Sequence, residues 1–263
     1  MKIQTLALLI LFTTGHGMHA AWMGHDDFED GIILDSCRVD FPDEFGDTPL
    51  NDAIYKNDIQ KVKQLIVSGA NVNRQDKYGN TPLYNVQDCR GNLLLFTAGT
   101  DVRLQMHAAN QKITPLLLAA GANVNLQNNC EEIALHVAAK YSAVETIILL
   151  LAHSADVNKS TKSGNTALHL AARFNTAAIQ ALLCAGAEID KQDCFGDTPL
   201  HYASHYKKTE AVQFLIASGA DIEIRNHDGY TAEELMNLPP VPFGALSHKK
   251  RKHDEVDAQS TNS

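Results

Sequence analysis

Short apolar patterns of helical spacing recur along the chain, with polar turns between them. Three of these patterns place large apolar residues at the same intervals, at positions 62, 65 and 66, at 147, 150 and 151, and at 212, 215 and 216. Residues three and four positions apart lie on one face of an α-helix, so each pattern predicts a short helix with one apolar face. Because a single helix pair has too little apolar surface to stand alone, we expect neighbouring pairs to stack and bury a continuous core.

Each predicted helix pair has a recurring beginning and end. The beginnings, of the type Thr-Pro-Leu-His, lie at residues 48–50, 81–83, 133–136, 166–169 and 198–201, with a last trace at 231–232. Thr before Pro favours a helix start, since the hydroxyl accepts from a backbone N–H and Pro in the first turn gives up no needed donor. The ends, of the type Gly-Ala-Asp-Val, begin at positions 69, 121, 154, 186 and 219, and glycine permits the left-handed conformation that ends a helix.

The spacing of the beginnings predicts a repeat protein. Outside one interval they are 33, 33, 32 and 33 residues apart. Residues 164–203, GNTALHLAARFNTAAIQALLCAGAEIDKQDCFGDTPLHYA, closely resemble the ankyrin repeat, and the resemblance extends over about residues 45–236. It implies an all-α repeat fold, an ankyrin-repeat solenoid of helix-turn-helix units with hairpin-like fingers. We expect about five units plus a C-terminal half-unit, in a domain over residues 45–237.

The exceptional interval holds the stretch KITPLLLAAGANVN, residues 112–125, which carries a beginning and an end without a middle. A finger can follow only an outer helix, so we interpret residues 114–120 as the outer helix of the unit that begins at Thr81, with an insertion at about residues 90–112. The alternative is a degenerate repeat, since Thr81 and Thr114 are again 33 residues apart. The apolar residues 93–96 in this interval either form a second binding surface or fold back over the outer helices.

Three histidines, His136, His169 and His201, occupy the same place in successive units. The resemblance implies that they make structural hydrogen bonds within and between units. The equivalent places hold Asn51, Tyr84 and Leu117, so we expect a weaker network in the N-terminal half.

The candidate binding surface comes from the positions that the resemblance puts at the end of the inner helix, beside the groove where ankyrin proteins usually bind partners. These positions hold three aromatic residues, each preceded by a basic or imidazole side chain: Tyr141, Phe174 and Tyr206, after Lys140, Arg173 and His205. Aromatic and Arg side chains are favoured binding anchors. The alternative is that each aromatic side chain only covers the neighbouring unit.

Both ends of the chain predict features outside the repeats. Residues 1–20 have the layout of a signal peptide with cleavage near 17–20, residues 21–44 are acidic, and residues 238–263 form a polar, partly basic tail that we expect to be disordered. The tail contains a basic cluster of the kind found in nuclear-import signals, Lys249, Lys250, Arg251 and Lys252. We expect export to the periplasm or beyond the cell; the alternative is a cytoplasmic protein with a hydrophobic N-terminus.

Composition narrows the function classes. The 263-residue chain has a formal net charge of −9, which disfavours nucleic acid as a partner because such binding requires many Lys and Arg residues. Five cysteines with no C-x-x-C pair predict neither a disulfide framework nor a zinc site, and Cys184 is expected in the core. No catalytic motif is present. We expect no enzymatic activity, cofactor, metal site or stable membrane insertion, and a monomer that binds a protein partner.

Ankyrin proteins resembling this one occur among the effectors that intracellular bacteria deliver into host cells, which would reconcile an export signal with a nuclear-import cluster. Two alternatives remain open. One is a structural or protective protein of the periplasm, and the other is a regulatory or inhibitory subunit of an enzyme.

Overall fold

The computed structural model describes residues 39–43, 46–88, 111–141 and 143–237. The chain divides after residue 35, and every described residue belongs to the second unit, residues 36–263. The described residues form helices and turns and contain no β-strand, so the all-α prediction is confirmed. The predicted signal peptide, the acidic segment up to residue 38 and the C-terminal tail lie outside the described residues.

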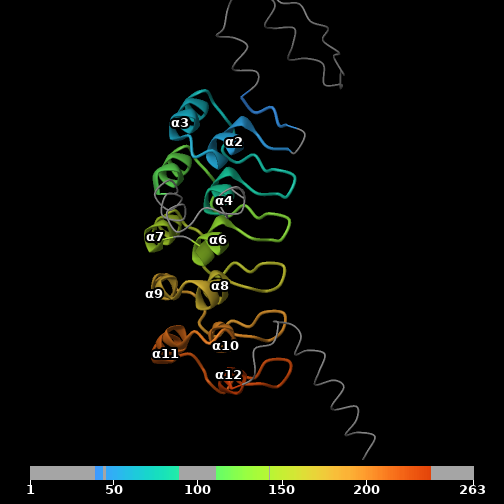
Figure 1. Ribbon diagram of the computed structural model, residues 1–263, viewed down its shortest axis with the longest axis vertical. Coiled ribbons are helices and arrows are strands. Elements are labelled where there is room, and N and C mark those ends of the chain that lie inside the picture. The colour runs from blue at the N-terminus through green and yellow to red at the C-terminus, as the bar shows by residue number, and fades with distance from the viewer. Residues whose placement is uncertain (1–38, 44–45, 89–110, 142, 238–263) are drawn as a thin grey trace, which may run out of the picture. The chain divides into compact units, whose positions relative to one another are not determined.

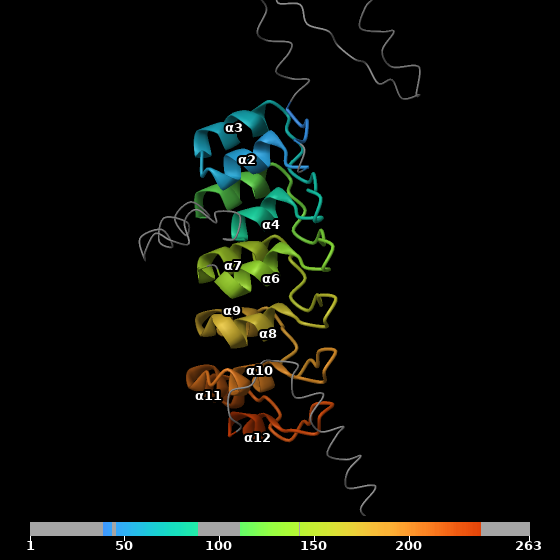
Figure 2. The ribbon, with the colours of Figure 1, turned by 45° about the vertical axis from the view of Figure 1, so that its right-hand side comes forward.

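The helices of the second unit stand in two columns, with turns that project away from the outer column (Figure 1). The inner column consists of α2 (Pro49–Tyr55), α4 (Pro82–Gln87), α6 (Ala134–Tyr141), α8 (Ala167–Phe174), α10 (Pro199–His205) and α12 (Ala232–Met236). The outer column consists of α3 (Ile59–Val67), a helix at residues 111–119, α7 (Val144–Ala152), α9 (Thr176–Cys184) and α11 (Thr209–Ala217). Figure 2 shows the same row after rotation, with each inner helix packed on the next.

The starts of α2 and α4 follow the sequence signals, whereas Thr114 and Pro115 lie inside the helix at residues 111–119 and do not begin it. The Thr48 hydroxyl accepts from the Asn51 N–H at 3.2 Å, and the Thr81 hydroxyl accepts from the Tyr84 N–H at 3.1 Å. Helix α6 has no Thr at its start, and there the His136 ring accepts from the Ile133 N–H at 3.1 Å. A side-chain cap of this kind stabilises a helix by about 1 kcal/mol.

Helix ends depend on the left-handed conformation rather than on close packing. Gly69 has a φ of 87°, and an added Cβ there would meet no atom within 4 Å. The Ala70 N–H then bonds to the Leu65 carbonyl at 2.9 Å, which satisfies a carbonyl at the end of the helix. Ser154 takes the same place after α7 with a φ of 65°, so a non-glycine residue is tolerated there.

The helix at residues 111–119 ends like the other outer helices. The Gly121 and Ala122 N–H groups bond to the Leu118 and Leu117 carbonyls at 3.0 Å, repeating the turn after α3. The Gln87 amide at the end of α4 donates to the Thr114 hydroxyl at 2.9 Å. Residues 111–119 thus take the outer place in the unit of α4. Of the insertion predicted at about residues 90–112, residues 90–110 lie outside the described residues and stay a prediction. Residues 111–112 belong to the helix, so the outer helix begins earlier than the predicted 114.

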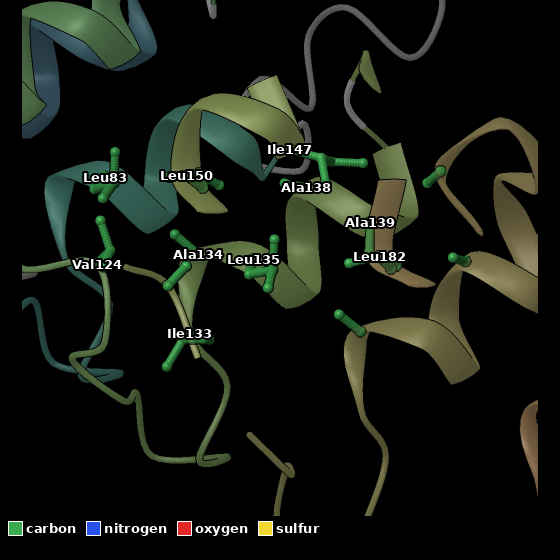
Figure 3. Close-up of a cluster of buried hydrophobic side chains, with 14 of the residues drawn as sticks. Leu83, Val124, Ile133, Ala134, Leu135, Ala138, Ala139, Ile147, Leu150 and Leu182 are labelled. Atoms are coloured by element: carbon green, nitrogen blue, oxygen red, sulfur yellow. The ribbon is translucent and has the colours of Figure 1, made fainter. Parts of the chain in front are cut away.

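The core is one continuous apolar cluster that runs through successive units. Figure 3 shows Leu83 of α4, Leu135 of α6 and Leu182 of α9 within it, all with no exposed surface. Burying a leucine side chain contributes about 1.5–3 kcal/mol, so each unit depends on the apolar faces of its neighbours. This packing fixes the register between units, and therefore which side chains of neighbouring units meet at the surface.

A row of polar side chains in the turns reinforces that register. Asn158 accepts from the Glu188 N–H at 2.8 Å and donates to the Gly186 carbonyl at 3.0 Å, so one amide binds the next unit twice. Asn73 and Asn125 make the equivalent pairs of bonds. Sequence reasoning missed this row, although its signal is the second Asn of the recurring Gly-Ala-Asn-Val-Asn ends.

Candidate functional site

Stacking of the units brings the six predicted binding residues into one row, which we call the aromatic ladder. Lys140 and Tyr141 end α6, Arg173 and Phe174 end α8, and His205 and Tyr206 end α10, with Tyr206 as the C-cap. They lie about one repeat apart in sequence, and the register of the inner helices aligns them. The ladder therefore consists of Lys140, Tyr141, Arg173, Phe174, His205 and Tyr206.

The rings and cations of the aromatic ladder alternate. The Lys140 Nζ lies 4.6 Å from the centroid of the Tyr141 ring and 4.9 Å from that of Phe174. The Arg173 Cζ lies 4.4 Å from the Phe174 centroid and 4.1 Å from that of Tyr206. Each cation thus contacts two rings from neighbouring units, and such contacts contribute about 0.5–1 kcal/mol where solvent is near.

Direct ring contacts complete the ladder. The Tyr141 and Phe174 centroids are 6.4 Å apart with the ring planes tilted by 38°, and the His205 and Tyr206 rings meet edge to face at 5.0 Å. Phe174 keeps 39% of its surface exposed, and the other five residues are half-buried. Burial raises the pKa of the Tyr206 hydroxyl, an effect that the nearby Arg173 charge opposes. The ladder is therefore packed along its length and still open at its centre.

The two strong cations of the ladder have no acidic partner in the described part of the chain. Neither the Lys140 nor the Arg173 side chain makes a hydrogen bond or ion pair there, and the Arg173 Nε is buried without an acceptor. A buried N–H without an acceptor costs about 1–3 kcal/mol. The ladder thus presents positive charge that the repeats themselves do not neutralise.

The three repeat histidines lie in the interior, away from the ladder. His169 Nδ1 lies 3.1 Å from the Thr166 backbone N–H, which can only donate, so this ring nitrogen accepts. Nε2 therefore carries the proton and donates to the Asp197 carbonyl of the next unit at 3.1 Å. His136 and His201 repeat the pattern, with Nε2 bonded to the Lys159 and Tyr230 carbonyls. These bonds support the structural role that the sequence resemblance implies.

Burial keeps these histidines neutral. Desolvation lowers the pKa of His169 to about 4, and it also lowers the pKa values of His136 and His201. Their hydrogen bonds to backbone carbonyls oppose this effect without reversing it. The rings therefore serve as fixed neutral bridges between units at neutral pH.

A buried polar cluster between two fingers is a second feature that sequence reasoning did not find. Asp193 Oδ1 accepts from the Phe195 and Asp197 N–H groups at 2.8 and 2.9 Å. Asp197 Oδ1 accepts from the Asn226 amide at 2.8 Å. Desolvation, aided by the charge of Asp193, raises the pKa of Asp197 to about 7, and the Asn226 bond opposes the rise. The carboxylates hold turns together, and the only sequence signal was Asp before Thr198.

Other predictions have separate outcomes. Cys184 is exposed, so the prediction that it packs in the core is wrong, because it lies on the outer face of α9. It lines a shallow apolar groove of about 500 Å³ together with Ile148 and Ala181.

The predicted nuclear-import cluster at residues 249–252 lies outside the described residues. Within the described residues, no helix has the length and apolar character to span a membrane, and no three metal-ligating side chains converge.

Comparisons with known proteins agree with this architecture. A family model described as "Ankyrin repeats (3 copies)" matches residues 105–193 and 174–235, and one described as "Ankyrin repeat" matches residues 45–77. The chain is 28% identical over 128 residues to ankyrin repeat protein OPG189 of monkeypox virus, and 27% identical to the protein of that name in variola virus. These alignments cover 44% of this chain and 23% of the viral proteins, so the chain spans less than a quarter of those relatives.

Proposed function

Because the chain belongs to the ankyrin-repeat family, we propose that it is a protein-binding module whose docking face is the aromatic ladder. The observation that carries the proposal is the alternation of rings and cations over three successive inner helices. Aromatic and Arg side chains bury much area with few rotatable bonds, which makes them efficient anchors at interfaces.

The alternative, that the rings only cover neighbouring units, accounts for part of the ladder. It explains the contact between Tyr141 and Phe174, but it does not explain why Phe174 remains 39% exposed. It also leaves Lys140 and Arg173 without acidic partners among the described residues of a protein that has an excess of acidic residues. A docking face accounts for both features.

Affinity capture from a cell extract, followed by chemical crosslinking, tests the docking face. The wild type is compared with a variant that carries Tyr141→Ala, Phe174→Ala and Tyr206→Ala. We expect the triple substitution to abolish capture of a directly crosslinked partner, while circular dichroism still reports a folded protein. Equal capture by both proteins would discard this face.

The matched control removes exposed apolar side chains from the outer helices. Ile148, Phe214 and Ile216 expose 54%, 36% and 47% of their surfaces, so their replacement by Ala deletes similar apolar area elsewhere. We expect this variant to capture the partner as well as the wild type does. If the control loses capture and the ladder variant does not, the docking face lies on the outer helices.

We further propose a binding protein without catalysis that acts as a monomer. In support of the absence of catalysis, the buried His169 and Asp197 are used in bonds between units, and the buried Asp193 is used in bonds within its own turn. Light scattering at several protein concentrations would test the monomer, and a mass that rises to twice the chain mass would contradict it.

For the cellular setting, we propose an exported protein of the effector type made by an intracellular bacterium. The support is the signal-peptide layout of residues 1–20 together with the basic cluster at 249–252. Cell fractionation and detection in host nuclei test the proposal. Recovery only from the periplasm would favour the structural or protective alternative. Co-purification with an enzyme whose rate changes on binding would favour the regulatory alternative.

A further inference from the structure

We infer that the aromatic ladder recognises a short acidic segment of its partner, in which Asp or Glu side chains stand next to apolar residues. This inference rests on the proposed docking face and adds the chemistry of the occupant. It follows from the two ladder cations, from the rings that hold them, and from the charge of the rest of the chain.

The packing of Arg173 leaves one kind of contact available to its guanidinium group. The rings of Phe174 and Tyr206 lie 4.4 and 4.1 Å from Cζ, while no described residue accepts a hydrogen bond from the group. With two rings against it and Nε buried, the group has the N–H donors of its two terminal nitrogens as the remaining binding element. A planar carboxylate is the natural complement of such donors, since it can accept two parallel hydrogen bonds.

Lys140 provides a second site of the same kind one unit away. Its Nζ lies over the Tyr141 and Phe174 rings and is likewise without an acidic partner in the described part of the chain. The partly exposed Phe174 contacts both cations. A segment with acidic residues on either side of an apolar one would pair with both cations and cover the ring between them.

Lys140 and Arg173 differ from three other cations of the described repeats, which form ion pairs. Lys61 and Arg74 also make no ion pair there, but neither contacts a ring, whereas Lys140 and Arg173 each lie against two rings. Lys56, at the end of α2, pairs with Asp52 at 2.9 Å, and Lys191 pairs with Glu188 at 3.0 Å. Arg225 pairs with Glu234 at 3.1 Å. The unit of α2 thus neutralises its terminal cation internally, whereas the units of α6 and α8 leave theirs for a partner.

The net charge limits the occupant to a segment with few charges. With a formal charge of −9, the whole chain repels polyanions at long range. Attraction at the ladder is short-range and partly shielded from solvent, where ion pairs are stronger than in water. One or two carboxylates flanked by apolar side chains gain this attraction with little long-range repulsion. A nucleic acid carries many negative charges, so the acidic chain would repel it.

The test selects binders from a displayed library of random twelve-residue peptides on the full-length protein. Binders are counted only if they fail to bind the Tyr141→Ala, Phe174→Ala, Tyr206→Ala variant. We expect these ladder-dependent peptides to be enriched in Asp and Glu next to aromatic or aliphatic residues. Isothermal titration then measures the best peptide, and exchange of its acidic residues for Asn or Gln should weaken binding about tenfold.

Single charge substitutions identify the residues responsible. Arg173→Gln and Lys140→Gln should each weaken binding of the selected peptide by about five- to tenfold, while circular dichroism still reports a folded protein. Lys56→Gln removes the same charge from the end of an inner helix whose cation is already paired, and should change affinity less than about twofold. If all three substitutions weakened binding equally, net charge alone would explain the effect, and the inference would be overturned.

The possible outcomes distinguish a failure of this inference from a failure of the proposed docking face. Ladder-dependent peptides with no enrichment in Asp and Glu would overturn the acidic occupant and leave the face intact. A single-stranded DNA oligonucleotide that displaces the peptide at equal charge concentration would point to a general anion site and also overturn it. A selection with no ladder-dependent peptide at all would contradict both proposals.

Discussion

The units around α6, α8 and α10 differ from those around α2 and α4 in how each binds the next unit. In the first group a buried histidine bridges from its own helix start to a backbone carbonyl of the following unit, as His169 does to Asp197. In α2, Asn51 takes that place, and its Oδ1 is buried without a partner. In α4, the Tyr84 hydroxyl instead reaches the Glu132 carboxylate at 2.5 Å.

The difference shows that each unit keeps a buried leucine in the inner helix but does not require a histidine at the next position. Leu50 and Leu83, beside Asn51 and Tyr84, are as fully buried as Leu168 beside His169. The polar bridge is therefore an added stabilisation that the C-terminal units possess and the N-terminal ones partly lack. Because stability in a repeat array sums over units and interfaces, we expect the N-terminal units to open first.

The largest expected effect comes from removing a histidine bridge. His169→Ala leaves the Thr166 N–H and the Asp197 carbonyl without their side-chain partner in the interior, which should lower the free energy of unfolding by about 3 kcal/mol. Asn51→Ala removes a side chain that is already incompletely bonded and should cost about 1 kcal/mol or less. Urea unfolding followed by circular dichroism measures both, and equal losses would remove the distinction between the two regions.

Asp197→Asn tests the buried carboxylate of the C-terminal region. Its folded-state pKa of about 7 lies above the unfolded value, so its contribution to stability is present below about pH 4 and is lost as pH rises to 7. The substitution should therefore stabilise the protein by about 2 kcal/mol at pH 8 and have little effect near pH 4. Asn165, in the equivalent place, shows that the fold accepts this residue.

Asp47→Asn is the matched N-terminal variant. Burial also raises the pKa of Asp47, but its side chain is only half-buried, so the gain at pH 8 should be smaller. Urea unfolding at pH 4 and pH 8 compares the two variants. A larger gain at position 47 would contradict the greater burial of the C-terminal cluster.

Protonation of the histidines should destabilise the C-terminal units at low pH. The folded-state pKa of His169, about 4, lies below the unfolded value, so its stabilisation is complete above about pH 6.5 and is lost as pH falls toward 4. Asp197 has the opposite effect, since it contributes stability at low pH, so the measurement is made in the Asp197→Asn background. There the free energy of unfolding should fall by about 1–2 kcal/mol as pH falls from 6.5 to 4. Adding His169→Gln should reduce the slope, to which His136 and His201 still contribute, and an unchanged slope would assign the loss to other groups.

The smallest expected effect concerns the row of turn amides. Asn158→Asp keeps the acceptor for the Glu188 N–H and removes the donor to the Gly186 carbonyl, so it should cost about 1 kcal/mol. Asp190 stands at the equivalent position of the next unit and accepts from the Asp221 N–H at 3.0 Å. Asp190→Asn should therefore be neutral or slightly stabilising. Thermal unfolding of both variants measures the difference, and a loss at both sites would show that the carboxamide donor is unimportant.

Local signals in the sequence predicted the helices well because their causes are local. Thr48 and Thr81 cap helices through N–H groups three residues away, and Gly69 ends one through its own φ angle. The prediction for Cys184 was wrong because proximity to a helix end does not reveal which face of that helix packs on its neighbour. The bonds of Asn158 were missed because their partners lie 28 and 30 residues away.

The sequence by itself determined the repeat period, the starts of most inner helices and the family, since capping, helix termination and apolar spacing act within a few residues. Only the tertiary structure decided that Lys140 and Arg173 are held between rings of neighbouring units without acidic partners in the described residues. It also decided that Asp197 is buried beside Asn226. These features depend on the register between units, which the stacked core sets across about one repeat length of chain.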